Sequence, residues 1–275
     1  MHNQHEAWNT DSGLRWARES DRRDRVLAPV AAALHAAAQL HTGERVLDVG
    51  CGCGATTLTA ARSVAPDGTA AGIDVSVPML DVARRRRDAT GITNVTFITG
   101  DAQTHQFTDP YDAVISRFGT MFFADQRAAF TNIASGLRSG GRLCLATWQR
   151  LAANEWLTIP RATLRRHGTV SAVDHTAPGM FGQSDPDAVT GDLVDTGFVD
   201  VDLHAVDLVL TVGADLDDGT DYLANLGMVR SVLETVPDHA RPAALDAIRT
   251  ALVEHTDDAG VHLGAAIWIV TASRR

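Results

Sequence analysis

The sequence predicts an α/β protein with a doubly wound, mostly parallel sheet. Three observations support this prediction. Short apolar runs alternate with helical stretches through residues 45–150, a glycine-rich turn directly follows the first apolar run, and a β-branched apolar run occupies residues 264–272. Alternation of strand and helix at this spacing is typical of parallel strands joined by right-handed crossovers.

The elements of this sheet follow from the apolar runs in order. RVLDV at 45–49, for example, is a short apolar run that meets glycines, as a buried strand does. Strands are predicted over 45–49, 69–74, 94–99, 111–116 and 141–148. Helices are predicted between them, over 54–64, 77–89 and about 124–138.

The pattern weakens after Trp148. A helix capped by Ser184 and ending at Gly197 is predicted before a strand over 198–210, and two helical segments follow over about 217–236 and 240–255. The strand at 264–272 must then return to the sheet across an insertion of roughly fifty residues, which is long enough to form a cap.

Composition excludes several classes of protein. The chain of 275 residues has 24 basic residues, all of them Arg, against 34 acidic residues, which gives a net charge of −10. The lack of Lys excludes Schiff-base and P-loop lysine chemistry, and the acidic charge argues against non-specific nucleic-acid binding. Three cysteines make no disulfide framework, and we see neither a membrane-spanning run nor a secretory signal. We therefore expect a cytoplasmic protein.

The strongest chemical signal is the turn after the first strand. Asp48 is followed by Gly50, Gly52 and Gly54, at the end of a strand and the start of a helix. Glycines serve a turn where φ is positive or where a ligand approaches the backbone, and open α/β sheets bind ligands at this edge. A turn with only a packing role is the alternative. With Ala55 the glycines also satisfy a loose dinucleotide fingerprint, so they do not by themselves select one nucleotide ligand.

Acidic residues at strand ends narrow the choice of ligand. Asp48 precedes the first glycine, where a carboxylate repels a pyrophosphate and favours a cation. Asp74 ends the second strand and can accept hydrogen bonds from two ribose hydroxyls; Asp101 follows the third strand. The alternative for Asp74 is a cap on the helix that begins near Ser76, and Asp101 has the same alternative.

These segments resemble the class I S-adenosylmethionine-dependent methyltransferases of the small-molecule type. The resemblance rests on VLDVGCGCG (46–54), GIDVS (72–76), GDA (100–102), YDAVISRFGTMFF (111–123) and LRSGGRLCLATW (137–148), in this order. It implies a Rossmann-like seven-stranded sheet whose last strand is antiparallel, here with a helical cap insertion. Cys53 departs from the Thr or Ser of many relatives.

The resemblance also implies cofactor roles. The glycine loop would pass the methionine part of S-adenosylmethionine, Asp74 would hold the ribose, and Asp101 with Ala102 would bracket the adenine beside Met79. The cofactor residues that we expect are Trp16, Asp48, Gly50, Cys51, Gly52, Asp74, Val75, Met79, Asp101, Ala102, Gln103, Ser116, Arg117 and Phe118. The product would be S-adenosylhomocysteine.

The predicted organisation has three parts. Residues 1–40 form an N-terminal helical lid with Trp16 as an aromatic wall, or equally an amphipathic helix packed on the sheet. Residues 41–148, 184–210 and 262–275 form the cofactor-binding core. Residues 149–183 and 211–261 form the cap and the substrate region. The basic run over 84–87 is interpreted as a solvated helix face.

Candidates for catalysis and substrate binding carry weaker signals. His105, His175 and Arg117 are the catalytic candidates by location, although a lone His is more often structural and Arg117 can equally pair with a nearby Asp. The substrate-binding candidates are Phe122, Trp148, Asn154 and Trp156; Phe122, with Phe123, is also a candidate for plain core. No metal site is expected.

The leading hypothesis is methyl transfer to a small-molecule or short-peptide acceptor, by in-line attack on an activated methyl group. The Arg-rich, Lys-free composition suggests bacterial specialised metabolism by association, and quinone-type C-methyltransferases share the same motifs. Two alternatives stay open: an NAD(P)-dependent oxidoreductase, and a catalytically silent module that binds S-adenosylmethionine as a regulator. We expect a monomer or homodimer without nucleic-acid or membrane partners.

Overall fold

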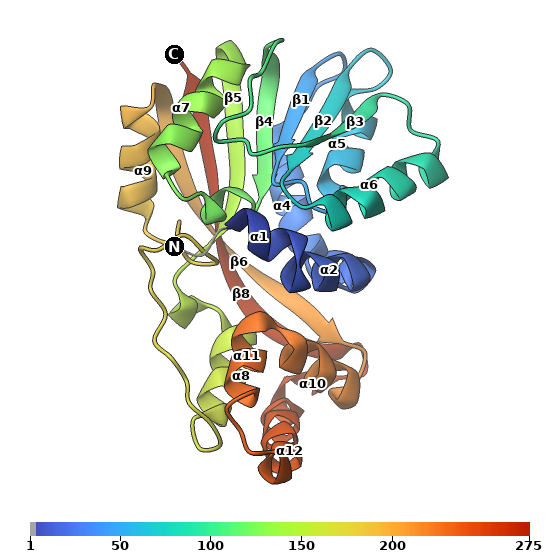
Figure 1. The fold of residues 1–275 in the computed structure, drawn as a ribbon, viewed down its shortest axis with the longest axis vertical. Helices are drawn as coiled ribbons and strands as arrows, with labels where there is room; N and C mark the ends of the chain where they lie inside the picture. Colours follow the sequence, from blue (N-terminus) through green and yellow to red (C-terminus); the bar gives the residue numbers. More distant parts are fainter. Residues whose placement is uncertain (1–3) are drawn as a thin grey trace. The chain divides into compact units, whose positions relative to one another are not determined.

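One mixed sheet organises the chain. The structure, a computed structural model, describes residues 4–275. The strand order is β3-β2-β1-β4-β5-β8-β6 (Figure 1), and β7 also pairs with β8. Strands β1 to β5 are parallel neighbours, and the last strands run antiparallel. The strands are β1 (Arg45–Val49), β2 (Thr69–Asp74), β3 (Val95–Thr99), β4 (Tyr111–Arg117), β5 (Leu137–Trp148), β6 (Phe198–Gly213), β7 (Thr256–Asp257) and β8 (Gly260–Arg274).

The helices precede the sheet, connect its strands, or belong to the second half of the chain. The first group is α1 (Gln4–Asn9), α2 (Asp11–Arg18), α3 (Ser20–Val26) and α4 (Ala28–Ala38). The connecting helices are α5 (Ala55–Val64), α6 (Val77–Thr90), α7 (Gln126–Gly136) and α9 (Pro186–Asp195). The others are α8 (Glu155–Leu164), α10 (Leu216–Asn225), α11 (Gly227–Leu233) and α12 (Arg241–Ala251).

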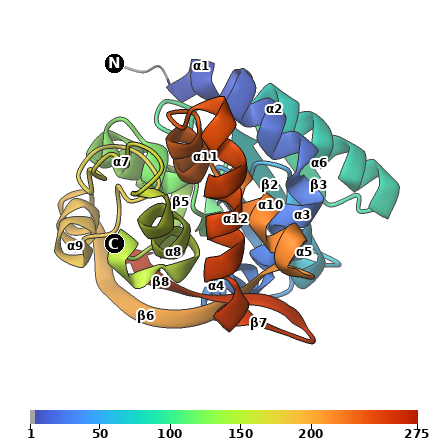
Figure 2. The ribbon, with the colours of Figure 1, turned by 90° about the horizontal axis from the view of Figure 1, so that it is seen from below.

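The chain divides into two compact units. Of the described residues, the first contains 4–148, 176–205 and 268–275, and the second contains 149–175 and 206–267. In the second unit, α8 packs against α11 and α12 (Figure 2). No helix in the described range is long and apolar enough to cross a membrane.

The fold class predicted from the sequence is confirmed, with local differences. Within residues 4–275 the sheet has eight strands and not seven, because the two-residue β7 pairs with β8 through a tight turn. Asp185, not Ser184, caps α9, since its side chain accepts a hydrogen bond from the Asp187 amide. The helical segment expected over 217–236 is interrupted after Asn225, where Leu226 has extended backbone angles.

The apolar strands of the first unit are buried by helices. Leu47, Val114 and Leu143 on neighbouring strands are at most 1% exposed, and they share one core cluster with Phe130 and Ile133 of α7. Parallel strands covered by helices read as continuous apolar runs, which is why the sequence pattern located them so well.

Two glycines hold the turn after β1 against the turn after β4. An ideal Cβ on Gly119 would lie 2.5 Å from the Val49 carbonyl oxygen and 2.7 Å from the Gly50 Cα. Gly119 has backbone angles in the ordinary helical region, so an alanine there causes no backbone strain. Its substitution therefore tests only the close contact with Val49 and Gly50. We expect Gly119→Ala to lower the free energy of unfolding by about 1–3 kcal/mol through overpacking, measured by urea denaturation.

Gly191 provides the matched control for this substitution. It lies within α9, and among the described residues no atom outside its chain neighbours and the nearby backbone of its own helix lies within 4 Å of its ideal Cβ. Gly191→Ala is expected to leave stability unchanged or to raise it by about 0.5–1 kcal/mol through helix propensity. Equal effects of the two substitutions would show that the Gly119 contact is not tight.

Candidate functional site

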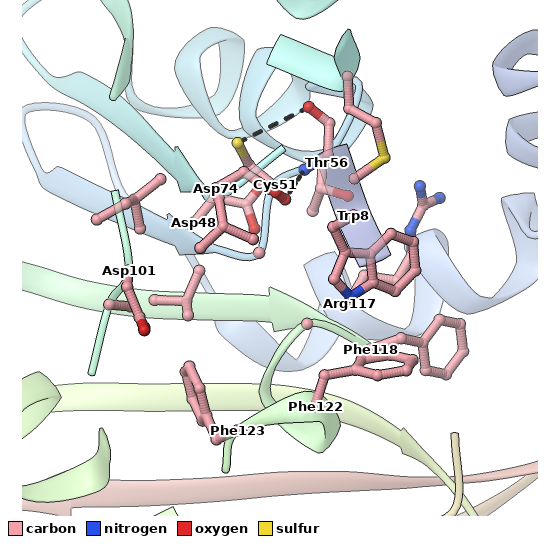
Figure 3. Close-up of a pocket in the computed structure, with 18 of the residues that line it drawn as sticks. Trp8, Asp48, Cys51, Thr56, Asp74, Asp101, Arg117, Phe118, Phe122 and Phe123 are labelled. Carbon is pink, nitrogen blue, oxygen red and sulfur yellow. Dashed lines mark hydrogen bonds between the residues drawn. The ribbon is translucent and has the colours of Figure 1, made fainter. Parts of the chain in front are cut away.

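A cavity of about 460 Å³ opens at the carboxyl ends of β1, β2 and β4. All of its lining residues belong to the first unit. Figure 3 shows Asp48 and Asp74 together on one side, with Trp8, Phe118 and Phe122 grouped on another. Every residue predicted for cofactor binding lines this cavity except Ser116.

The glycine loop between β1 and α5 forms one wall. Gly50, Gly52 and Gly54 have φ values of +66°, +52° and +80°, which side chains rarely adopt. The Gly52 amide donates a hydrogen bond of 2.8 Å to Oδ2 of Asp74, so the loop is tied to the end of β2. This arrangement leaves main-chain atoms of the loop facing the cavity.

Asp48 carries the unusual electrostatics of the site. Its side chain is 1% exposed, and its Oδ2 accepts a hydrogen bond of 2.7 Å from Thr57 Oγ1. Its Oδ1 has no hydrogen-bond partner among the described residues. Burial raises the pKa of Asp48 to about 7, against the opposing effects of Thr57 and Arg117. A buried carboxylate oxygen without a partner, on the wall of a cavity, is suited to a cationic ligand that donates a hydrogen bond.

This burial predicts a pH-dependent stability for the ligand-free protein. The folded pKa of Asp48, about 7, lies above its ordinary value of 3.8. The stabilisation is therefore complete below about pH 4 and is lost as the pH rises through 7, by roughly 4 kcal/mol at about 1.4 kcal/mol per unit. Urea denaturation at pH 5, 6, 7 and 8 measures this slope. Asp48→Asn is expected to flatten the dependence of the free energy of unfolding on pH. An unchanged slope in that variant would contradict the attribution of this dependence to Asp48.

Asp74 organises the turn after β2. It is 8% exposed, and Oδ1 accepts a hydrogen bond of 2.8 Å from the Ser76 amide while Oδ2 accepts the Gly52 amide. Burial raises the pKa of Asp74, and the backbone donors oppose that rise. Ser76, not Asp74, occupies the N-cap position of α6. Each carboxylate oxygen has a second lone pair, so Asp74 can accept two more donors from a ligand.

The turn after β3 forms another wall. Oδ1 of Asp101 accepts a hydrogen bond of 2.9 Å from the Gln103 amide, and the Gln103 side chain also donates to this carboxylate. Ala102 and Met79 are buried and present apolar surface to the cavity. An acidic turn beside apolar walls is suited to a flat, partly polar ring.

Aromatic side chains line the side nearest the N-terminal helices. The Trp8 ring meets Trp16 edge to face, with 6.0 Å between the ring centroids. It also meets Phe122 edge to face, at 5.2 Å (Figure 3). Phe118 stacks on Trp148 at 4.2 Å and has a φ of +68°. A bulky residue with positive φ is strained, and such strain gathers at functional sites.

The N-terminal helices are fastened to the loop that follows Asp74. The Asn9 side chain donates a hydrogen bond of 2.8 Å to the Val75 carbonyl and accepts one of 3.0 Å from the Val77 amide. The Ser76 hydroxyl donates to the Trp8 carbonyl at 2.6 Å. These bonds place Trp8 over the cavity.

The cysteines of the loop are poor nucleophiles. Burial raises the pKa of Cys51 well above its ordinary value and that of Cys53 to about 11. Both thiols are therefore protonated at neutral pH, and the loop contributes shape and backbone to the cavity.

The remaining candidate residues have other places. Ser116 is buried and donates a hydrogen bond of 2.7 Å to the Val49 carbonyl, which joins the ends of β4 and β1. Trp148 backs Phe118, and His105 packs edge to face on Phe107 without lining the cavity.

Three other candidates lie in the second unit. Asn154 and Trp156 are buried there, where Asn154 Oδ1 accepts hydrogen bonds from the Trp156 indole and the Ala266 amide. His175 belongs to the same unit. The catalytic and substrate roles suggested for these residues stay predictions.

Sequence reasoning missed several lining residues. Trp8, Asp24 and Thr56 line the cavity. Trp8 could have been predicted, because its spacing from Trp16 in the sequence places both on one face of a helix. No local sequence pattern indicates that Asp24 lines the cavity. The basic run over 84–87 also needs correction at Arg86, whose side chain is only 19% exposed and pairs with Asp24. It is therefore not part of a simple solvated face.

Two named relatives are similar in sequence. The chain is 36% identical over 107 residues to aklanonic acid methyltransferase DauC of Streptomyces sp. (strain C5), a match covering 38% of this chain and 49% of that protein. It is 31% identical over 191 residues to nocamycin O-methyltransferase of Saccharothrix syringae, covering 64% of this chain and 67% of that protein. The chain thus matches about half the length of the first relative and two thirds of the second.

Solved structures share the fold. Phosphoethanolamine N-methyltransferase 2 of Haemonchus contortus, in complex with S-adenosyl-L-methionine, matches with a TM-score of 0.60 and 18% identity, over 100% of this chain and 60% of that one. A methyltransferase from Thiobacillus denitrificans, in complex with S-adenosyl-L-homocysteine, matches with a TM-score of 0.53 and 23% identity. The match covers 94% of this chain and 97% of that one.

A family profile supplies the remaining evidence. The profile of the methyltransferase domain matches residues 40–177, half of the chain, which include the glycine loop and the turns after β2, β3 and β4. The match, the strand order and the named relatives agree. The chain belongs to the class I S-adenosylmethionine-dependent methyltransferases.

Proposed function

We propose that this protein binds S-adenosylmethionine in the cavity and transfers its methyl group to a small-molecule or short-peptide acceptor. The observation that carries the proposal is the buried carboxyl group of Asp48, which has an oxygen without a hydrogen-bond partner among the described residues and belongs to a residue that lines the same cavity as Asp74 and Asp101. A zwitterionic sulfonium nucleoside supplies an ammonium, two ribose hydroxyls and an adenine, which are the groups that these walls fit.

The chain's own residues bind and orient in this proposal. Asp48 accepts a hydrogen bond from the ammonium, Asp74 accepts the ribose hydroxyls, and the turn at Asp101 and Ala102 holds the adenine against Met79. The bound cofactor supplies a methyl group already activated by positive sulfur, so in-line positioning of the acceptor is the main requirement. Trp8 and Phe122 line the cavity, where aromatic rings exclude water and interact favourably with a cation.

The acceptor class rests on the named relatives. Aklanonic acid methyltransferase and nocamycin O-methyltransferase are named for small-molecule acceptors, and both come from bacteria. We extend that class, within bacterial specialised metabolism, to this chain. The aromatic lining of the cavity supports an acceptor with substantial apolar surface.

Calorimetry with S-adenosylhomocysteine tests the cofactor assignment. We expect a single site of micromolar or tighter affinity and no binding of NAD(H) at the same concentration, because Asp48 repels a pyrophosphate. Absence of S-adenosylhomocysteine binding at high micromolar concentration would refute the proposal. Transfer of a tritiated methyl group to small-molecule extracts then separates an enzyme from a silent binding module.

A further inference from the structure

Arg117 is the cationic side chain that lines the cavity among the described residues. It ends β4, and its side chain is 13% exposed. Its Nη2 donates a hydrogen bond of 2.7 Å to Oδ1 of Asp24 on α3. A guanidinium has five N–H donors, so this pairing leaves donors for a second anion.

Asp24 is itself held from the other side. Its Oδ2 accepts a hydrogen bond of 2.8 Å from Nη1 of Arg86, and the same Nη1 donates to the Cys53 carbonyl at 3.0 Å. Arg86 also pairs with Asp21 through Nη2. A half-buried chain of charges therefore connects α6, the glycine loop, α3 and the end of β4.

We propose that Asp24 is a positioning residue: it holds the Arg117 guanidinium in place to bind the carboxylate of the cofactor's methionine tail. This inference rests on the proposed function. The tail carries an ammonium and a carboxylate on one carbon, and the residues that line the cavity include Asp48, which has a carboxylate oxygen without a partner among the described residues, and Arg117, which has a guanidinium. The positive charge of Arg117 already acts on Asp48, where it lowers the carboxyl pKa against the effect of burial.

The competing explanation is that Asp24 only fastens α3 to α6 through Arg86. That role would affect all ligands of the cavity equally, whereas a positioning role affects only ligands with the carboxylate. The measurement must therefore compare two ligands that differ in this group. S-adenosylhomocysteine and its decarboxylated analogue, which keeps the ammonium, form such a pair.

The test is calorimetric titration of the wild-type chain, Asp24→Asn and Asp21→Asn with both ligands. Asp24→Asn is expected to weaken S-adenosylhomocysteine binding about tenfold and to change binding of the decarboxylated analogue by less than about twofold. Asp21→Asn is the matched control. Asp21 lies on α3, as Asp24 does, and also pairs with Arg86 of α6, but it does not line the cavity. This substitution is expected to change neither affinity by more than about twofold.

Arg117→Met completes the design. It is expected to weaken S-adenosylhomocysteine more than Asp24→Asn does, and the double variant should bind no more weakly than Arg117→Met, because Asp24 acts through Arg117. Equal weakening of both ligands by Asp24→Asn, or additive effects in the double variant, would overturn the positioning role. If the wild-type chain binds neither ligand, the cofactor assignment itself has failed, which is a distinct result.

Discussion

Replacing Asp74 by alanine is expected to weaken S-adenosylhomocysteine binding by at least about 100-fold. The carboxylate accepts hydrogen bonds from the Gly52 and Ser76 amides and, in the proposed complex, from two ribose hydroxyls. Hydrogen bonds to a charged group contribute about 1.5–3 kcal/mol each, so loss of the ribose pair alone amounts to roughly 3 kcal/mol or more. Release of the Gly52 amide adds to this loss by loosening the glycine loop. Calorimetry measures the affinity directly.

The control for this substitution is Asp81→Ala. Asp81 is an exposed carboxylate on α6 that pairs with Arg84 on the same helix, and it does not line the cavity. Its removal is expected to leave affinity within about twofold and stability within about 0.5 kcal/mol. An Asp74→Ala variant that folds and keeps its affinity would show that the ribose lies elsewhere.

The second large effect concerns pH. Because burial raises the pKa of Asp48 to about 7 and the cofactor ammonium needs the ionised carboxylate, binding below pH 7 must release a proton. We expect the affinity for S-adenosylhomocysteine to rise toward tenfold per pH unit below pH 7 and to level off above it. Calorimetry at pH 6 in buffers of different ionisation enthalpy counts the released proton.

Asp48→Asn separates this effect from general acid sensitivity. The amide cannot titrate, so the variant is expected to bind about 10- to 100-fold more weakly at pH 8 with no slope between pH 6 and 7. A wild-type chain whose affinity is flat across this range would place the ammonium away from Asp48. Such a result would leave the ribose assignment to Asp74 intact.

The core of the fold is predictable from the sequence because its signals are local. The apolar residues of RVLDV are all buried, as in a parallel strand covered by helices, and the glycines that follow it have the positive φ values that only glycine adopts freely. Asp48 and Asp74 end up together because parallel strands bring their carboxyl ends to one edge, a consequence of topology alone.

The rest of the site depends on contacts between distant segments. Asp24 meets Arg86 and Arg117 across separations of 62 and 93 residues, and no local pattern marks these partners. Asn154 follows β5 closely in the sequence, but no local pattern indicates that its side chain accepts a hydrogen bond from the distant Ala266 amide; its substrate role stays a prediction. Pairings that depend on tertiary packing are invisible to periodicity and capping rules.

The attachment of the N-terminal helices has an evolutionary consequence. Asn9 bonds the main-chain carbonyl of Val75 and the main-chain amide of Val77, and the Ser76 hydroxyl meets a main-chain carbonyl in return. Substitution of the side chains at positions 75 and 77 is therefore expected to leave these hydrogen bonds intact, although Val75 also lines the cavity. In an alignment of homologues, we expect these contacts to produce no covariation between Asn9 and positions 75 and 77. Only Asn9 and Ser76, which bond through their side chains, are expected to be conserved because of the contact.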